Sequence, residues 1–259
     1  MQDAHGTFVW YELMTTDTKA AKAFYTTVAG WTAKDSGMPG MDYTLFCAPN
    51  GAHVAGLTTM PPGAADMNAP PAWLGYIAVR DVDASATEVT ANGGTVHRAP
   101  DDIPGVGRFA IVADPHGGVF ALFRGTDGEA PPTAPMGTPG FFGWNELMAG
   151  DLASDFAFYT KLFEWTKFDA MDMGAMGVYQ IFGKGEAMFG GMMTKPAGTP
   201  MPPWWTFYIN VEAIDAAIER VNAAGGKVTN GPMEVPGGAW IIQGMDPQGA
   251  GFALVAPKR

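Results

Sequence analysis

The feature that most constrains the fold of this chain is an internal repeat. FVWYELMTTD at residues 8–17 returns as FGWNELMAGD at residues 142–151, so Trp10 and Glu12 correspond to Trp144 and Glu146. ANGGTV at 91–96 likewise matches AAGGKV at 223–228, and ADPHGGVFALF at 113–123 matches MDPQGAGFALV at 245–255. A chain that repeats itself once over nearly its whole length is expected to fold as two similar domains.

Within each repeat, the hydrophobic periodicity switches between strand and helix. FVWYELMTT alternates and predicts a strand, and Asp17 is a candidate N-cap for a helix that ends at Gly30. Three short apolar runs separated by Gly, Pro and Asn then predict an antiparallel meander, after which the same order restarts near Trp73. Each repeat therefore predicts two βαβββ modules, and the chain contains four.

These patterns set the expected boundaries. The first domain spans residues 6–125, with modules at 6–60 and 72–125. The second spans residues 139–257, with modules at 139–195 and 204–257. Residues 126–138, rich in Pro, Gly and Thr, are the expected linker.

Composition excludes several classes of function. The formal net charge is -11, which disfavours nucleic-acid partners because these require clustered Lys and Arg. No basic N-terminal region precedes an apolar run, and no apolar stretch is long enough to span a bilayer, so we expect no membrane partner and a cytoplasmic protein. Cys47 is the single cysteine, so no internal disulfide forms, and we expect its side chain to be buried.

The order of elements resembles a known family. The residues that carry the resemblance are AFY at 23–25 and 157–159, the VRDVDA and VEAIDA turns, and the DP.G turns before the last strands. The chain is similar over nearly its whole length to the vicinal oxygen chelate superfamily, which includes glyoxalase I, bleomycin-resistance proteins and extradiol dioxygenases. The resemblance implies an α+β fold of two tandem glyoxalase-like domains, each a pair of βαβββ modules whose curved mixed sheets enclose a cavity.

The resemblance also implies positions for metal ligands, and these positions lack ligand side chains. The first-strand positions fall at Trp10 and Trp144, and the fourth-strand positions at Gly56 and Gly191. The positions in the second modules fall at Leu74, Thr206, Ala121 and Ala253. None of these is a good ligand for Zn, Ni or Fe(II), so we expect no cofactor, with a divalent metal at an atypical site as the alternative.

Glu12 and Glu146 are the candidate catalytic residues. Each shares a strand face with the tryptophan two positions before it, and the resemblance directs that face into the cavity. Three roles remain open: a carboxylate held by an arginine, a backbone amide or water; a group that contacts substrate or transfers a proton; and a metal ligand. Recurring aromatic residues suit a flat or apolar ligand, and the candidate ligand-binding residues are Trp10, Trp144, Tyr43, Tyr179, Trp73, Trp205, Tyr76 and Tyr208.

Histidines and methionines are weaker candidates. None of the histidines recurs, which favours surface or hydrogen-bonded roles; His5 is expected in a mobile N-terminus, while His53 and His116 are better candidates for catalysis than His97. A group of methionines is expected to line a pocket or fill the core of the second domain: Met171, Met173, Met176, Met188, Met192 and Met193.

Three classes of function fit these observations. The preferred class is a binder of a small apolar or aromatic molecule that works without the usual metal. The second is an enzyme, either glyoxalase- or dioxygenase-like with an unusual metal site, or hydroxylase- or isomerase-like through Glu12 and Glu146. The third is an interaction protein whose cavities are filled by its own tryptophans. Because relatives with one domain per chain pair two chains, we expect a monomer with an internal pseudo-dimer, or a homodimer.

Overall fold

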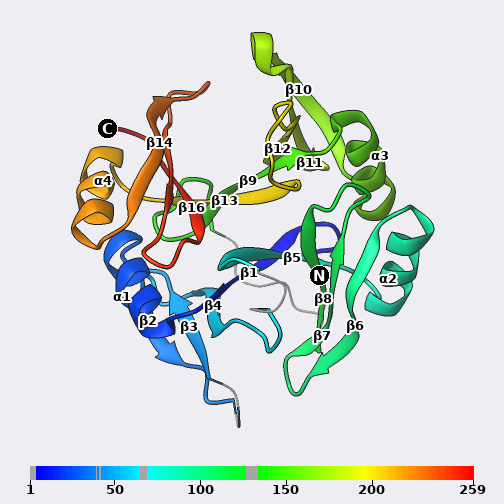
Figure 1. Ribbon diagram of the computed structural model, residues 1–259, viewed down its shortest axis with the longest axis horizontal. Helices are drawn as coiled ribbons and strands as arrows, with labels where there is room; N and C mark the ends of the chain where they lie inside the picture. Colours follow the sequence, from blue (N-terminus) through cyan, green and yellow to red (C-terminus); the bar gives the residue numbers. More distant parts are fainter. Residues whose placement is uncertain (1–3, 39, 41, 65–68, 127–133) are drawn as a thin grey trace. The chain divides into compact units, whose positions relative to one another are not determined.

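The computed structural model describes residues 4–38, 40, 42–64, 69–126 and 134–259, and it confirms the α+β fold of four βαβββ modules (Figure 1). The first repeat contains β1 (Phe8–Thr15), α1 (Thr18–Val28), β2 (Thr32–Asp35), β3 (Tyr43–Cys47), β4 (His53–Thr59), β5 (Ala72–Ala78), α2 (Val82–Ala91), β6 (Thr95–Ile103), β7 (Gly107–Ala113) and β8 (Val119–Gly125). The second repeat contains β9 (Phe142–Ala149), α3 (Leu152–Phe163), β10 (Thr166–Asp172), the 3-10 turn η1 (Gly174–Met176), β11 (Val178–Lys184), β12 (Ala187–Thr194), β13 (Trp204–Asn210), α4 (Ile214–Ala223), β14 (Lys227–Glu234), β15 (Trp240–Met245) and β16 (Gly251–Ala256).

The strands form two mixed sheets with the same order. These orders are β2-β3-β4-β1-β5-β8-β7-β6 and β10-β11-β12-β9-β13-β16-β15-β14. Within a module the last three strands are antiparallel, whereas the first strand pairs in parallel with the fourth. The parallel register places Glu12 opposite Gly56 and Glu146 opposite Gly191. Both candidate carboxylates therefore lie beside the glycines of the fourth strands.

Contacts group the modules into two compact units that do not follow the repeat. Among the described residues, unit 1 consists of 4–9, 74–126 and 144–205, and unit 2 consists of 10–38, 40, 42–64, 69–73, 134–143 and 206–259. In unit 1, α2 lies beside α3, and in unit 2, α1 lies beside α4 (Figure 1). The domain boundaries read from the repeat remain a prediction, and most of the expected linker lies outside the described residues.

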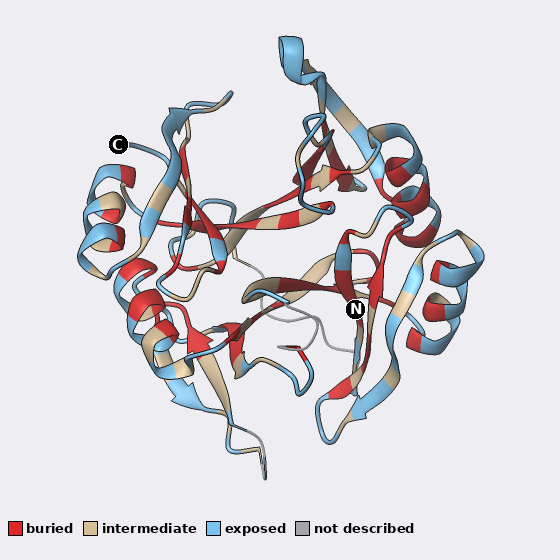
Figure 2. Cartoon of the chain, viewed as in Figure 1, coloured by how far each residue is buried: buried red, intermediate tan, exposed pale blue. Residues whose placement is uncertain are grey.

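Helix ends follow from local chemistry. Asp17 caps α1 as predicted, because its carboxylate accepts a 2.9 Å hydrogen bond from the Ala20 amide; Asp81 and Asp151 cap α2 and α3 in the same way. Replacing such a cap by alanine typically costs about 1 kcal/mol. Helix α1 ends at Val28, two residues before Gly30, which takes a left-handed φ of 70° that a glycine adopts without strain. Each helix buries one face and exposes the other (Figure 2).

Aromatic side chains form the core of each unit. In unit 2, Tyr25 contacts Trp31 and Trp73, and the Trp31 indole N–H donates to the Gly140 carbonyl at 2.7 Å. Unit 1 repeats the arrangement around Tyr159, Trp165 and Trp205, and the Trp165 indole donates to the Gly6 carbonyl at 2.6 Å. Large aromatic residues dominate the energetics of protein cores. Trp31 and Trp165 also hold segments that are distant in sequence, around Gly140 and Gly6 respectively, against these cores.

One buried hydrogen bond joins two modules within each unit. The Tyr25 hydroxyl on α1 donates to Asp246 at 3.2 Å, and the Tyr159 hydroxyl on α3 donates to Asp114 at 3.0 Å. Burial is the main cause of the raised pKa of both carboxyls. The AFY and DP.G segments therefore belong together in the fold: the tyrosine of one is the partner of the aspartate of the other.

Candidate functional site

A hydrogen-bonded relay of Trp, Tyr and Glu lies on the first module, within unit 2. Trp10 and Glu12 come from the same face of β1, and Tyr43 begins β3. The Trp10 indole N–H donates to the Tyr43 hydroxyl at 2.9 Å, and the Tyr43 hydroxyl hydrogen-bonds to Glu12. All three side chains are half-buried, whereas Tyr11, Leu13 and Thr15 on the opposite face of β1 are buried. The alternation predicted for this strand is therefore present.

The third module, within unit 1, contains the same relay. The Trp144 indole N–H donates to the Tyr179 hydroxyl at 2.8 Å, and that hydroxyl donates to Oε2 of Glu146 at 3.1 Å. Glu146 is only 8% exposed, so its carboxylate is the more enclosed of the two. A buried carboxylate requires hydrogen bonds, and the tyrosine supplies one of them.

Glycines on the fourth strands make room for the relay. A Cβ atom built on Gly56 would overlap the Tyr43 hydroxyl, and one built on Gly191 would overlap the Tyr179 hydroxyl. Any larger residue at either position would displace the tyrosine. The fourth-strand position at which the family resemblance puts a metal ligand is therefore filled in this chain by a phenol from the third strand.

The electrostatics of the relay keep the phenols protonated. Burial, followed by the negative charge of Glu12, raises the pKa of Tyr43 far above its usual range. Burial and Glu146 raise the pKa of Tyr179 in the same way. Each tyrosine is consequently a neutral hydrogen-bond donor to its carboxylate at any ordinary pH, and neither phenol can act as a base.

The donor set does not suit the metal that the family implies. Zn, Ni, Mn and Fe(II) sites need several lone-pair donors that converge at about 2 Å. Each relay offers one carboxylate, an indole with no lone pair to donate, and a protonated phenol. Within the parts of the chain that the structure describes, no three His, Cys, Asp or Glu side chains are grouped so that they could hold a metal ion.

Of the other aromatic candidates, Trp205, Tyr76 and Tyr208 lie in the cores of their units, whereas Trp73 is half-buried. Trp73 donates to the Tyr25 hydroxyl at 2.9 Å, and Trp205, 8% exposed, packs against Tyr159 and Trp165. Tyr76 and Tyr208 are buried; Tyr76 packs against Phe109 and Phe123, and Tyr208 accepts a 2.8 Å hydrogen bond from Gln243. Contact between these four side chains and a ligand remains a prediction.

The weaker candidates are dispersed. His5 is buried, so the expectation of a mobile N-terminus at this residue was wrong; Lys184 donates to its carbonyl and fixes the segment. Met192 and Met193 are buried, whereas Met173, Met176 and Met188 are exposed, so the methionines do not form one cluster. Cys47 is buried, as predicted.

His116 forms an ion pair that the sequence did not reveal. Its Nδ1 lies 2.5 Å from Oδ1 of Asp155, whose carboxylate is fully buried and also accepts from the Gly150 amide at 2.9 Å. The hydrogen bond to Asp155 is the main cause of the raised pKa of His116. Gln248 and Ala21 occupy the corresponding positions of the other repeat, so unit 2 has no equivalent pair.

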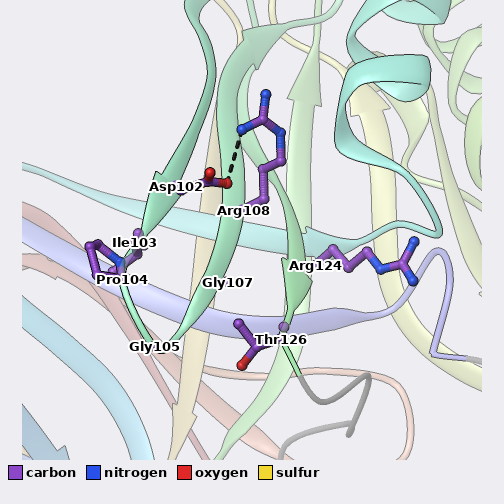
Figure 3. Close-up of a pocket in the computed structure, with 9 residues that line it drawn as sticks. Asp102, Ile103, Pro104, Gly105, Gly107, Arg108, Arg124 and Thr126 are labelled. Atoms are coloured by element: carbon purple, nitrogen blue, oxygen red, sulfur yellow. Dashed lines mark hydrogen bonds and ion pairs between the residues drawn. The ribbon is translucent and has the colours of Figure 1, made fainter.

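A groove of about 440 Å³ lies at the end of the β6–β7 hairpin of unit 1 (Figure 3). Its lining includes Arg108, Arg124 and Thr126, and none of the residues singled out from the sequence. Arg108 is ion-paired with Asp83 and Asp102, and Arg124 donates to the Arg80 carbonyl. Because internal partners already engage both guanidinium groups, the groove is a weak candidate for binding an anion.

The fold and the site define a class: a tandem chain of four βαβββ modules in which a Trp–Tyr–Glu relay stands where related proteins are expected to hold a metal. The Glyoxalase/Bleomycin resistance protein/Dioxygenase superfamily model matches residues 7–122 and 142–254. The chain belongs to this superfamily, which confirms the resemblance inferred from the sequence.

Individual relatives extend the comparison. The chain is 35% identical over 253 residues to a Mycobacterium tuberculosis protein, CFP32, provisionally called a glyoxylase, covering 97% of this chain and 95% of that protein. It is 32% identical over 266 residues to the anthracycline biosynthesis protein DauV of Streptomyces sp., covering 97% and 94%. The crystal structure of a Mn(II)-bound glyoxalase from Novosphingobium aromaticivorans superposes with a TM-score of 0.67 at 19% identity, covering 99% of this chain and 83% of that one, and this likeness concerns the fold alone.

No helix among the described residues is both long and apolar enough to cross a bilayer.

Proposed function

We propose that this protein binds a small aromatic molecule at the two Trp–Tyr–Glu relays without a catalytic metal. The observation that carries the proposal is the duplication of the relay, with matching hydrogen bonds in two modules and a glycine in each that accommodates the tyrosine. A half-buried indole offers a broad apolar surface, and the carboxylate beside it offers one fixed polar contact, a combination typical of small-molecule sites. The name of the relative DauV, an anthracycline biosynthesis protein, supports a flat polycyclic ligand.

The test is calorimetric titration of the full chain with a neutral planar probe, 9-(hydroxymethyl)anthracene. We expect saturable binding that is lost in the double variant Trp10→Ala/Trp144→Ala. Trp240→Ala is the matched control, because this half-buried indole contacts Arg259 and belongs to neither relay. Absence of binding by the wild-type chain, or equal loss in the control variant, contradicts the proposal.

An enzyme of the same superfamily is the second candidate, and the fixed position of each carboxylate favours it. Glu12 and Glu146 would then transfer protons, since the phenols cannot act as bases. This function requires conversion of the bound compound. Product that forms with wild-type protein and disappears with Glu12→Gln/Glu146→Gln, while binding persists, would establish it in place of simple binding.

A further inference from the structure

The direction of each hydrogen bond in the relays limits what a ligand can present to them. An indole N–H is a donor only, a phenol has one proton, and an ionised carboxylate is an acceptor only. The Trp10 indole donates a hydrogen bond to the Tyr43 hydroxyl, which in turn donates one to Glu12. Trp144, Tyr179 and Glu146 repeat the pattern. Both donors of each relay are therefore used internally, so the relay itself has no N–H or O–H group left to offer a ligand.

Resting on the proposed function, we propose that the two relays select aromatic ligands that carry a protonated amine and reject ligands that carry a carboxylate. An ammonium group can donate to the relay carboxylate, and a hydrogen bond between two charged partners is about twice as strong as a neutral one. An anionic group meets no available donor within the relay and is repelled by the glutamate.

Two further observations point to a cation. The face of an indole attracts ammonium groups through its quadrupole, and each relay presents a half-buried indole beside its carboxylate. The chain as a whole has 26 acidic against 15 basic residues, so its field raises the local concentration of cations and lowers that of anions.

The experiment compares three probes with one ring system: 9-(aminomethyl)anthracene, which is cationic at pH 7, neutral 9-(hydroxymethyl)anthracene, and anionic anthracene-9-carboxylate. Titrations of the wild-type chain at 0.15 M salt should give affinities in the order cation, neutral, anion, with about tenfold between the first two. Glu12→Gln/Glu146→Gln should bring the cationic probe to within about threefold of the neutral one, because the amide keeps the acceptor but loses the charge.

Glu88→Gln/Glu219→Gln is the control for net charge, because it also removes two carboxylates and both are exposed helix residues that belong to neither relay. This variant should keep the full preference for the cation. If the neutral probe binds but the cation binds no tighter, or if the anion binds best, the selectivity is refuted while the proposed function stands. If none of the three probes binds, the proposed function itself fails and the selectivity fails with it. A preference that survives the double relay variant also overturns the inference.

Discussion

Removal of one buried hydroxyl, by Tyr25→Phe, tests how the modules of unit 2 are joined. Tyr25 is fully buried; its hydroxyl accepts from the Trp73 indole at 2.9 Å and donates to Asp246 at 3.2 Å. The substitution keeps the ring and deletes both hydrogen bonds. A bond to a charged group contributes about 1.5–3 kcal/mol and a neutral one about 0.5–1.5 kcal/mol, so the expected loss is about 2–4.5 kcal/mol.

The loss should depend on pH. Burial raises the pKa of the Asp246 carboxyl, and the bond from Tyr25 opposes that rise. In the Tyr25→Phe variant, the pKa of Asp246 should therefore be higher than in the wild type. Since a carboxyl with a raised folded pKa loses stability as the pH rises through that pKa, the variant should be further below wild type at pH 8 than at pH 4.

Differential scanning calorimetry at both pH values measures the effect, and a loss of this size corresponds to roughly 4–18 °C in Tm for a chain of this length. In an Asp246→Asn background the same tyrosine substitution should cost less, because the charged acceptor is already gone. A loss below about 0.5 kcal/mol, or one that is equal at the two pH values, would refute the account, given the typical strength of a buried hydrogen bond.

Three further predictions concern the relay, the ion pair and the metal. Gly56→Ala should destabilise the protein by about 1–3 kcal/mol because the added methyl group overlaps the Tyr43 hydroxyl. In a Tyr43→Ala background the same substitution should be nearly neutral, because the overlapping hydroxyl is gone. Urea titrations of the wild type, the two single variants and the double variant measure this coupling, and simple additivity would contradict it. His116→Gln should flatten the pH dependence of Tm between about pH 6 and 9. Because the pKa of His116 is raised, the stability from its pair with Asp155 is complete below about pH 6.5 and is lost as the pH rises through the pKa of the folded state. An unchanged profile would show that the pair contributes nothing. Elemental analysis after dialysis should find far less than one equivalent of Zn, Ni, Mn or Fe per relay, and a metal retained in stoichiometric amount would move the enzyme alternative to first place.

Local physics made much of the fold predictable. Alternation on β1, the Asp17 cap and the restart of the pattern near Trp73 are properties of short segments, because side-chain period and capping chemistry depend on neighbours in sequence. The repeat strengthened each of these predictions, since a pattern that occurs twice in the same order is unlikely to arise by chance. Even the pairing of Trp10 with Glu12 on one strand face followed from a period of two.

Which residue becomes a hydrogen-bond partner of each glutamate was decided by the tertiary structure. The sequence left three roles open for Glu12 and Glu146: a carboxylate held by an arginine, a backbone amide or water, a substrate-contacting or proton-transferring group, and a metal ligand. It marked Gly56 only as a position without a metal-ligating side chain. Folding brings Tyr43 across from β3 into the space that this glycine leaves, and the phenol becomes a hydrogen-bond partner of the carboxylate. Such a contact depends on strand register and on the volume of a neighbouring residue.

The division into compact units is a second feature that the sequence did not predict. The sequence determines four similar modules and their order, because each module is specified by its own periodicity and turns. It does not determine which modules share a core. Tyr25 meets Asp246, and Tyr159 meets Asp114, although each pair is far apart in the chain and would not be matched by the repeat. Burial of complementary aromatic and polar surfaces decides that pairing, and only the three-dimensional arrangement of the chain contains that information.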